Sequence, residues 1–196
     1  MEECIICNSK FKKINDYVYK CINCSFFKSK LKPGHGRDIE GIRELRRKNF
    51  KKIVDIILSL NVNQDLKILE IGSGNGFFIK ECKKLNVDIT GSEADEEQYN
   101  LLTKKFSNII KITLPIKDLN NELLNKFDVV VFNDVFEHLE NLDLILIQLK
   151  SILKTNGQII INLPSSDGLI YKFSNILNKI GFTNFYDRLW QKNLAS

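Results

Sequence analysis

The sequence predicts an α/β fold with a doubly wound, mostly parallel sheet. From residue 66 onwards, short apolar runs alternate with segments of helical periodicity, which is the pattern of strand–helix–strand crossovers. The runs at 128–132 and 158–163 are almost continuously apolar, as strands buried on both faces are. With 196 residues, 43% of them apolar, the chain is long enough for one sizeable core and a small accessory unit.

Strands and helices are expected in alternation along this part of the chain. The apolar runs place five strands at residues 67–71, 88–92, 108–113, 128–132 and 158–163. Apolar residues at helical spacing predict helices at residues 77–85, 95–105, 117–125, 140–154 and 169–180. The predicted sheet domain therefore spans residues 61–196, with helices on both faces.

Four cysteines near the N-terminus form two CxxC pairs that are separated by 13 residues. The pairs are Cys4 with Cys7 and Cys21 with Cys24. Two tight turns of this kind bring four thiolates to one point, which is the ligand set of a structural, tetrahedral Zn²⁺. The metal would supply the folding energy that so short a segment cannot obtain from a core. Residues 1–32 are therefore predicted to form a zinc ribbon; a redox pair, or cysteines that have lost their metal, are the alternatives.

The segment 33–60 is predicted to contain a linker and a basic amphipathic helix. Proline and glycines at 33–36 mark the linker, in which His35 is expected to be a solvated loop residue. The net charge of +5 arises from this end of the chain, because residues 1–52 hold 14 Lys and Arg against 6 Asp and Glu. Such a surface attracts phosphates or nucleic acid, or is simply a solvated face.

A glycine-rich turn, KILEIGSGNGFFI at residues 67–79, follows the first strand of the sheet. In parallel sheets ligands bind over the carboxyl ends of the strands, where glycines let the backbone approach closely. Dinucleotide sites use G-x-G-x-x-G, whereas Gly72, Gly74 and Gly76 form G-x-G-x-G, two residues after Glu70. A carboxylate at the mouth would repel a pyrophosphate and suits an ammonium and a sulfonium, which disfavours a nicotinamide-dependent oxidoreductase. Glu93 ends the next strand, where a ribose diol needs an acceptor.

These motifs resemble those of class I S-adenosylmethionine (SAM)-dependent methyltransferases. ILEIGSGNGFF at residues 68–78 is similar to the first motif of the family, and residues 127–166 are similar to its fourth-strand and fifth-strand region. The resemblance implies a Rossmann-like fold and SAM as the cofactor. It implies that the cofactor is bound by Glu70, Gly72, Ser73, Gly74, Gly76, Glu93, Ala94 and Asn133.

The family's sheet has seven strands, whereas the apolar pattern of this sequence predicts five strands up to residue 163. Residues 181–191 could add one strand at most, so the C-terminal strand pair is apparently missing. Either the chain is truncated, or a partner or a second copy covers the open edge, because an uncovered edge strand promotes association.

His138 is the predicted general base. It follows the fourth strand, on the side where the cofactor is expected, and a base that removes a hydroxyl proton accelerates methyl transfer. Three alternatives remain open: His138 caps a helix that begins near residue 139, it forms a hydrogen bond with a backbone group, or it binds a divalent cation together with Glu137. Asp134 is expected to organise the loop.

The expected acceptor is a small molecule, with a hydroxyl or phosphate-type oxygen on a sugar or phosphorylated precursor of surface polysaccharide. The tail, residues 186–196, is similar to methyltransferases encoded among such genes. One alternative is an rRNA or tRNA methyltransferase that grips RNA with the zinc module; nucleic acid is disfavoured as a partner but not excluded. Another is a non-catalytic zinc-ribbon scaffold. No stretch has the apolar length of a membrane helix, so a cytoplasmic protein is predicted.

Overall fold

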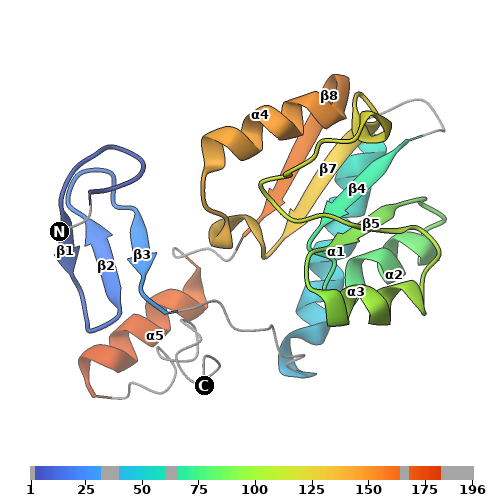
Figure 1. Ribbon diagram of the computed structural model, residues 1–196. Coiled ribbons are helices and arrows are strands. Elements are labelled where there is room, and N and C mark those ends of the chain that lie inside the picture. Colours follow the sequence, from blue (N-terminus) through green and yellow to red (C-terminus); the bar gives the residue numbers. More distant parts are fainter. Residues whose placement is uncertain (1–2, 32–39, 61–65, 164–167, 182–196) are drawn as a thin grey trace. The chain divides into compact units, whose positions relative to one another are not determined.

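The computed structural model describes residues 3–31, 40–60, 66–163 and 168–181 (Figure 1). The chain divides into two compact units. Gly36–Pro164 form the first, which we call the α/β unit. Met1–His35 together with Ser165–Ser196 form the second, which we call the cysteine unit.

The α/β unit contains a five-stranded parallel sheet with the strand order β6-β5-β4-β7-β8, which confirms the predicted fold class. The strands are β4 (Ile68–Ile71), β5 (Thr90–Glu93), β6 (Ile109–Lys111), β7 (Phe127–Asn133) and β8 (Leu153–Asn162). The order reverses between β4 and β7, so a crevice is expected over the carboxyl ends of these two strands. Within the described residues β8 is an edge strand, and the predicted sixth strand falls on residues that the structure does not describe.

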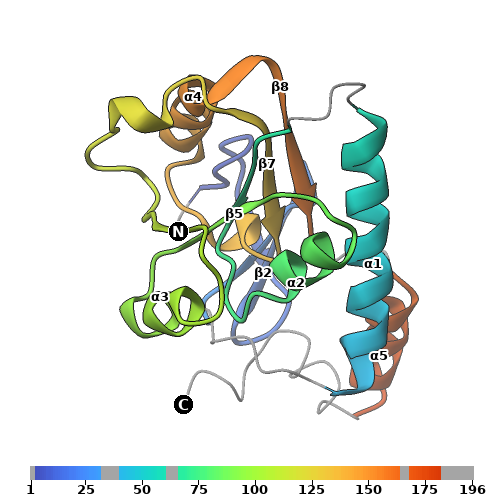
Figure 2. The ribbon, with the colours of Figure 1, turned by 90° about the vertical axis from the view of Figure 1, so that its right-hand side faces the viewer.

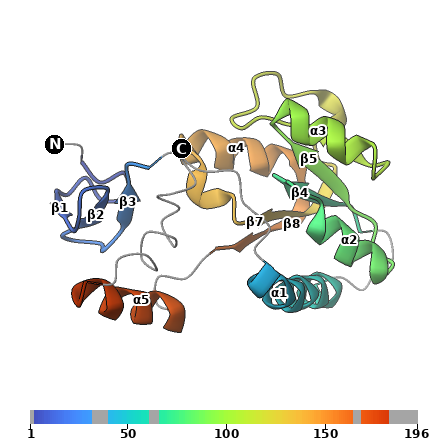
Figure 3. The same cartoon turned by 90° about the horizontal axis from the view of Figure 1, so that it is seen from below.

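Helices cover both faces of this sheet (Figure 3). On one face lie α1 (Glu40–Ser59) and α2 (Phe77–Lys84), which run side by side and join through an edge-to-face contact of Phe50 with Phe78 (Figure 2). On the other face lies α4 (Leu142–Ile152), whose buried residues pack on β7. The remaining helix, α3 (Glu96–Thr103), follows β5. The described helices are all too short or too polar to span a lipid bilayer.

The helix predicted at residues 117–125 is wrong. This stretch is an extended loop that contains only a short 3-10 turn, η1 (Asn121–Leu123). Gln148 of α4 explains the difference, because its side-chain amide both donates to the carbonyl of Ile116 and accepts from its N–H, at 2.7 and 2.8 Å. The carbonyl of Ile116, which would accept the first hydrogen bond of such a helix, is thus bound by a residue more than thirty positions away.

The cysteine unit contains a three-stranded antiparallel sheet, in the order β1 (Phe11–Lys13), β2 (Val18–Cys21) and β3 (Phe27–Ser29). Its apolar core is small: Tyr17 and Val18 are buried, with Phe27 and Leu31 packed against them. The predicted C-terminal helix is present as α5 (Leu169–Lys179) and belongs to this unit. So small a core gives little stability by itself.

Candidate functional site

The glycine turn between β4 and α2 adopts a conformation that only glycine takes easily. Gly72, Gly74 and Gly76 have φ angles of +72°, +49° and +73°. A methyl group on Gly72 would lie 2.7 Å from Val135, and one on Gly76 would lie 2.4 Å from Phe106. A methyl group on Gly74 would meet no atom within 4 Å. The outer glycines therefore serve packing, whereas Gly74 borders open space that a ligand can enter.

Glu93 joins this turn to the end of β5. One carboxylate oxygen accepts from the Gly74 N–H at 2.8 Å, and the other accepts from the N–H groups of Ala94 and Asp95 at 2.9 and 3.1 Å. The carboxylate is only partly buried, so lone pairs remain on the solvent side. The predicted residues Gly74, Glu93 and Ala94 are thus brought together.

Ser92 is a member of the site that the sequence did not reveal. It is fully buried, its N–H donates to Ser73 Oγ, its carbonyl accepts from the Ser73 N–H, and its hydroxyl donates to the Glu70 carbonyl. These bonds fix the predicted residue Ser73 against β5. The only signal in the sequence is the position of Ser92 at the end of a strand, directly before Glu93.

Glu70 lies beneath the turn, not at its mouth. Its side chain is on the α1 and α2 face of β4 and is 2% exposed, which corrects the expected solvent-facing position. Asn133 Nδ2 donates to Glu70 Oε1 at 2.9 Å, while Oε2 is buried with no hydrogen-bond partner among the described residues. Burial raises the pKa of Glu70 to about 7, against the opposing effect of the Asn133 hydrogen bond. Repulsion of a pyrophosphate by Glu70 is therefore weaker than predicted, and the unpaired oxygen is suited to a cationic donor.

A polar group lies beyond the end of β7. Asp134 has φ +55° and forms an ion pair with Arg46 of α1 at 3.7 Å. Burial raises the pKa of Asp134, and the nearby Arg46 and His138 oppose that rise. The basic face of α1 therefore reaches the ligand edge of the sheet at Arg46.

His138 belongs to a short 3-10 turn, η2 (Phe136–His138), and its Nε2 lies 3.9 Å from Glu137 Oε1. The alternative that His138 caps the following helix is wrong, because α4 begins at Leu142 after Asn141. His138 is exposed and close to Asp134. It is therefore free to reach a ligand held at this edge.

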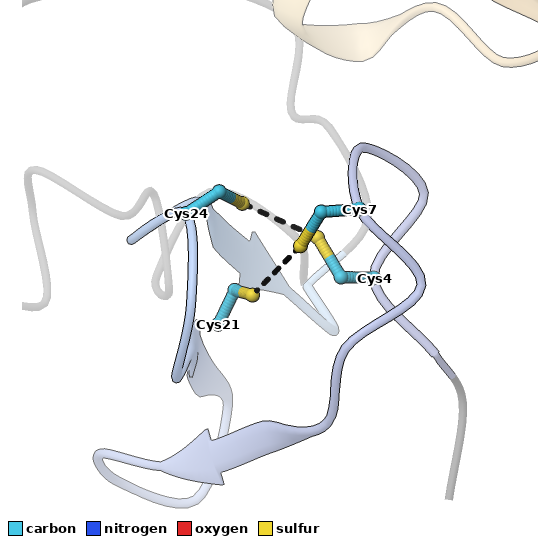
Figure 4. A group of neighbouring side chains, drawn as sticks. All are labelled: Cys4, Cys7, Cys21 and Cys24. Atoms are coloured by element: carbon cyan, nitrogen blue, oxygen red, sulfur yellow. Dashed lines mark hydrogen bonds between the residues drawn. The ribbon is translucent and has the colours of Figure 1, made fainter.

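The four predicted metal ligands meet at one point in the cysteine unit (Figure 4). Their sulfur atoms all lie within 4.8 Å of one another, with Cys4 to Cys24 at 3.6 Å and Cys7 to Cys21 at 3.5 Å. Tetrahedral Zn–S bonds of about 2.3 Å require sulfur separations of about 3.8 Å. Hydrogen bonds from Ser9 lower the pKa of Cys7 to about 6. Against the opposing backbone hydrogen bond of Phe26, burial and hydrogen bonds to the other three thiols raise the pKa of Cys24 to about 12. The group fits Zn²⁺.

A family model described as a methyltransferase domain matches residues 42–194. The chain belongs to this methyltransferase family. The match begins within α1 and includes all five strands of the α/β unit, so the glycine turn and the residues around it lie inside the methyltransferase domain.

Among relatives of this methyltransferase, the ubiquinone biosynthesis O-methyltransferase of Pelagibacter ubique is 28% identical over 132 residues, covering 65% of this chain and 54% of the relative. An rRNA adenine N-6-methyltransferase of Streptococcus sanguinis is 31% identical over 71 residues, covering 36% and 29%. The chain thus spans about half the length of the first relative, and less of the second. A solved SAM-dependent methyltransferase from Archaeoglobus fulgidus shares the fold, with a TM-score of 0.51, 24% identity, and coverage of 72% and 60%.

Proposed function

We propose that this methyltransferase moves a methyl group from SAM to a hydroxyl oxygen of a small molecule. One observation carries the proposal. Beside the switch point of the sheet, Glu93 offers a hydrogen-bond acceptor and Gly74 leaves the backbone open to a ligand, while the unpaired Glu70 oxygen lies beneath them. When bound, SAM supplies a methyl group on a sulfonium that is already activated for displacement.

The residues of the turn have complementary tasks in this proposal. Glu93 would accept hydrogen bonds from the two ribose hydroxyls with the lone pairs that face solvent. Gly74 would let the nucleoside lie against the backbone, where any side chain would intrude. Glu70 would accept from the ammonium, because a cation beside a buried carboxylate favours its charged form.

The residues beyond β7 favour a hydroxyl over a phosphate as the acceptor group. Asp134 and Glu137 lie there beside His138, and Arg46 is paired with Asp134, so the local charge disfavours an anion. His138 would accept the hydroxyl proton as methyl transfer proceeds. The O-methyltransferase named above supports oxygen methylation of a small molecule. The narrower prediction of a surface-polysaccharide precursor has no support among these relatives.

RNA methylation is the second candidate, favoured by the rRNA methyltransferase relative and by the lysines of the cysteine unit. Two of those lysines, however, cover the aromatic rings on which bases would stack. Lys20 lies over the ring of Phe27 at 5.3 Å and Lys30 over that of Tyr19 at 4.7 Å, so each ring already carries a cation. Binding of an rRNA fragment with a steep salt dependence would favour this candidate instead.

The cysteine cluster is proposed to hold a structural Zn²⁺. Four sulfur ligands complete a tetrahedron, so no position remains for a substrate. The ion would cross-link the turn before β1 with the turn after β2, and it would stabilise a unit in which few of the described apolar residues are buried.

Calorimetry on the whole chain tests the main proposal. SAM and S-adenosylhomocysteine (SAH) are expected to bind with one site per chain, and NAD⁺ is expected not to bind. Catechol and methyl glucoside then serve as probe acceptors, with SAH release as the readout. The proposal fails if neither SAM nor SAH binds, or if NAD⁺ binds in their place.

A further inference from the structure

Three polar side chains form a chain of hydrogen bonds across the carboxyl ends of β4, β7 and β8. Asn162 Nδ2 donates to Asn133 Oδ1 at 3.3 Å, and Asn133 Nδ2 donates to Glu70 Oε1 at 2.9 Å. The three residues lie on the face of the sheet that α1 and α2 cover, together with Ile160, Val131 and Ile68. Asn162 is not among the cofactor residues that the sequence predicted.

The backbone holds Asn162 in place for this contact. Asn133 and Asn162 are paired in the register of β7 with β8, and the Asp134 N–H donates to the Asn162 carbonyl at 3.0 Å. The backbone position of Asn162 is therefore set by the sheet itself, on a strand and not on a loop.

The direction of the chain of bonds matters because an asparagine amide has two unlike ends. If Asn133 turned over, its oxygen would face the Glu70 carboxylate, and two acceptors would oppose each other. The donor of Asn162 disfavours this, because it bonds to the oxygen of Asn133 on the side away from Glu70. Glu70 thereby receives one hydrogen bond on Oε1 and keeps Oε2 unpaired.

We propose that Asn162 is a positioning residue that acts through Asn133 to keep Glu70 oriented as an acceptor for the ammonium group of the cofactor. This inference rests on the proposed function, because it assigns the unpaired oxygen to a cationic group of SAM. It extends the site from the switch point to the edge strand β8.

A double-mutant cycle tests the inference. Asn162→Ala, Asn133→Ala and the double variant are titrated with SAH between about pH 6 and pH 8.5, a range that brackets the pKa of Glu70, about 7. Asn162→Ala is expected to weaken SAH binding about fivefold at neutral pH, the size of one net hydrogen bond. It should also move the pH at which affinity is half lost upward by about half a unit, because Glu70 loses support for its charged form. In the Asn133→Ala background the same change should have no further effect.

Two controls separate positioning from general damage. 5′-Methylthioadenosine has the nucleoside but no ammonium, so its affinity should be the same in wild type and Asn162→Ala. Asn156→Ala changes an exposed asparagine at the opposite end of β8 and should leave the SAH titration unchanged. If Asn162→Ala does not fold, the isosteric Asn162→Asp replaces it, with a larger upward shift in the pH midpoint expected because it removes the donor and adds a charge.

The outcomes are distinguishable. If wild type binds neither SAH nor 5′-methylthioadenosine, the proposed function itself fails. If SAH binds but Asn162→Ala leaves both affinity and pH midpoint unchanged, the inference is overturned. It is equally overturned if the effects of the two substitutions add, since Asn162 would then act independently of Asn133.

Discussion

The Glu93 carboxylate accepts a hydrogen bond from the Gly74 N–H at 2.8 Å, across 19 residues of sequence. This contact connects the turn after β4 to the end of β5, and it forms without a ligand. It holds the turn in one shape. Three residues of the turn have left-handed backbone angles, and without Glu93 the Gly74 N–H would bond only to solvent. Ligand binding at this point therefore needs little reorganisation of the backbone.

Glu93→Gln is expected to weaken SAH binding by about 10- to 100-fold, because a neutral amide accepts hydrogen bonds at one atom only and loses the charge assistance. Isothermal calorimetry measures the change. Glu97→Gln, an exposed glutamate in the first turn of α3, is the matched control and should bind as wild type does. Equal affinities of Glu93→Gln and wild type would remove Glu93 from the cofactor site.

Gly74→Ala should separate binding from folding. The new methyl group meets no protein atom, so the cost to folding is only the left-handed strain of about 1–2 kcal/mol. The methyl group would occupy the open space that the ligand is proposed to fill. SAH affinity should therefore fall at least about tenfold, because the extra group would collide with the bound ligand. Gly72→Ala should lose more folding stability and less SAH affinity than Gly74→Ala, because its methyl group would clash with Val135. Thermal unfolding and calorimetry on both variants decide the matter; tight SAH binding by Gly74→Ala would show that the ligand lies elsewhere.

Local sequence signals predicted the turn but not the burial of its acidic residue. The glycine spacing fixes positive φ angles because it depends on residues within one short stretch. The environment of Glu70 depends on Asn133, 63 residues away, and on the helices that cover β4. Likewise the Gln148 side chain bonds to the backbone of Ile116 and holds the loop there. A periodic pattern of apolar residues cannot show such a contact. Ser92 and Asn162 were missed for the same reason, since their roles come from neighbouring elements.

His138→Ala is expected to lower kcat about 10²- to 10⁴-fold on a probe acceptor that wild type methylates, because the hydroxyl would lose the group that takes its proton. SAH affinity should stay within about twofold of wild type, since His138 lies beyond β7 and not on the glycine turn. His35→Ala, the only other histidine of the sequence, is the control and should retain full kcat. Unchanged kcat in His138→Ala would exclude a base role.

Cys21→Ser should abolish metal binding. Plasma emission spectroscopy of wild type is expected to give one zinc per chain, and the variant none, because three remaining thiolates hold the ion far more weakly. Amide protection in β1 to β3 should be lost with the metal, and chelation of the wild type should have the same effect. Cys82→Ala is the matched control: Cys82 is buried in the core of the α/β unit, so zinc content should remain at one. Zinc-free wild type with a protected β1–β3 sheet would contradict the assignment.

Glu70 should make the protein less stable as the pH rises. Its pKa is 4.5 in an ordinary environment and about 7 in the fold, so below pH 4.5 it is protonated in both states and has no effect. Between these values the unfolded chain releases the proton while the folded chain keeps it, which lowers the free energy of unfolding by about 3 kcal/mol. Glu70→Gln cannot titrate, so urea unfolding should show the variant gaining about that amount relative to wild type from pH 4.5 to about pH 8. Glu97→Gln should show no such trend, and a constant difference between Glu70→Gln and wild type across this range would mean that Glu70 ionises normally in the fold.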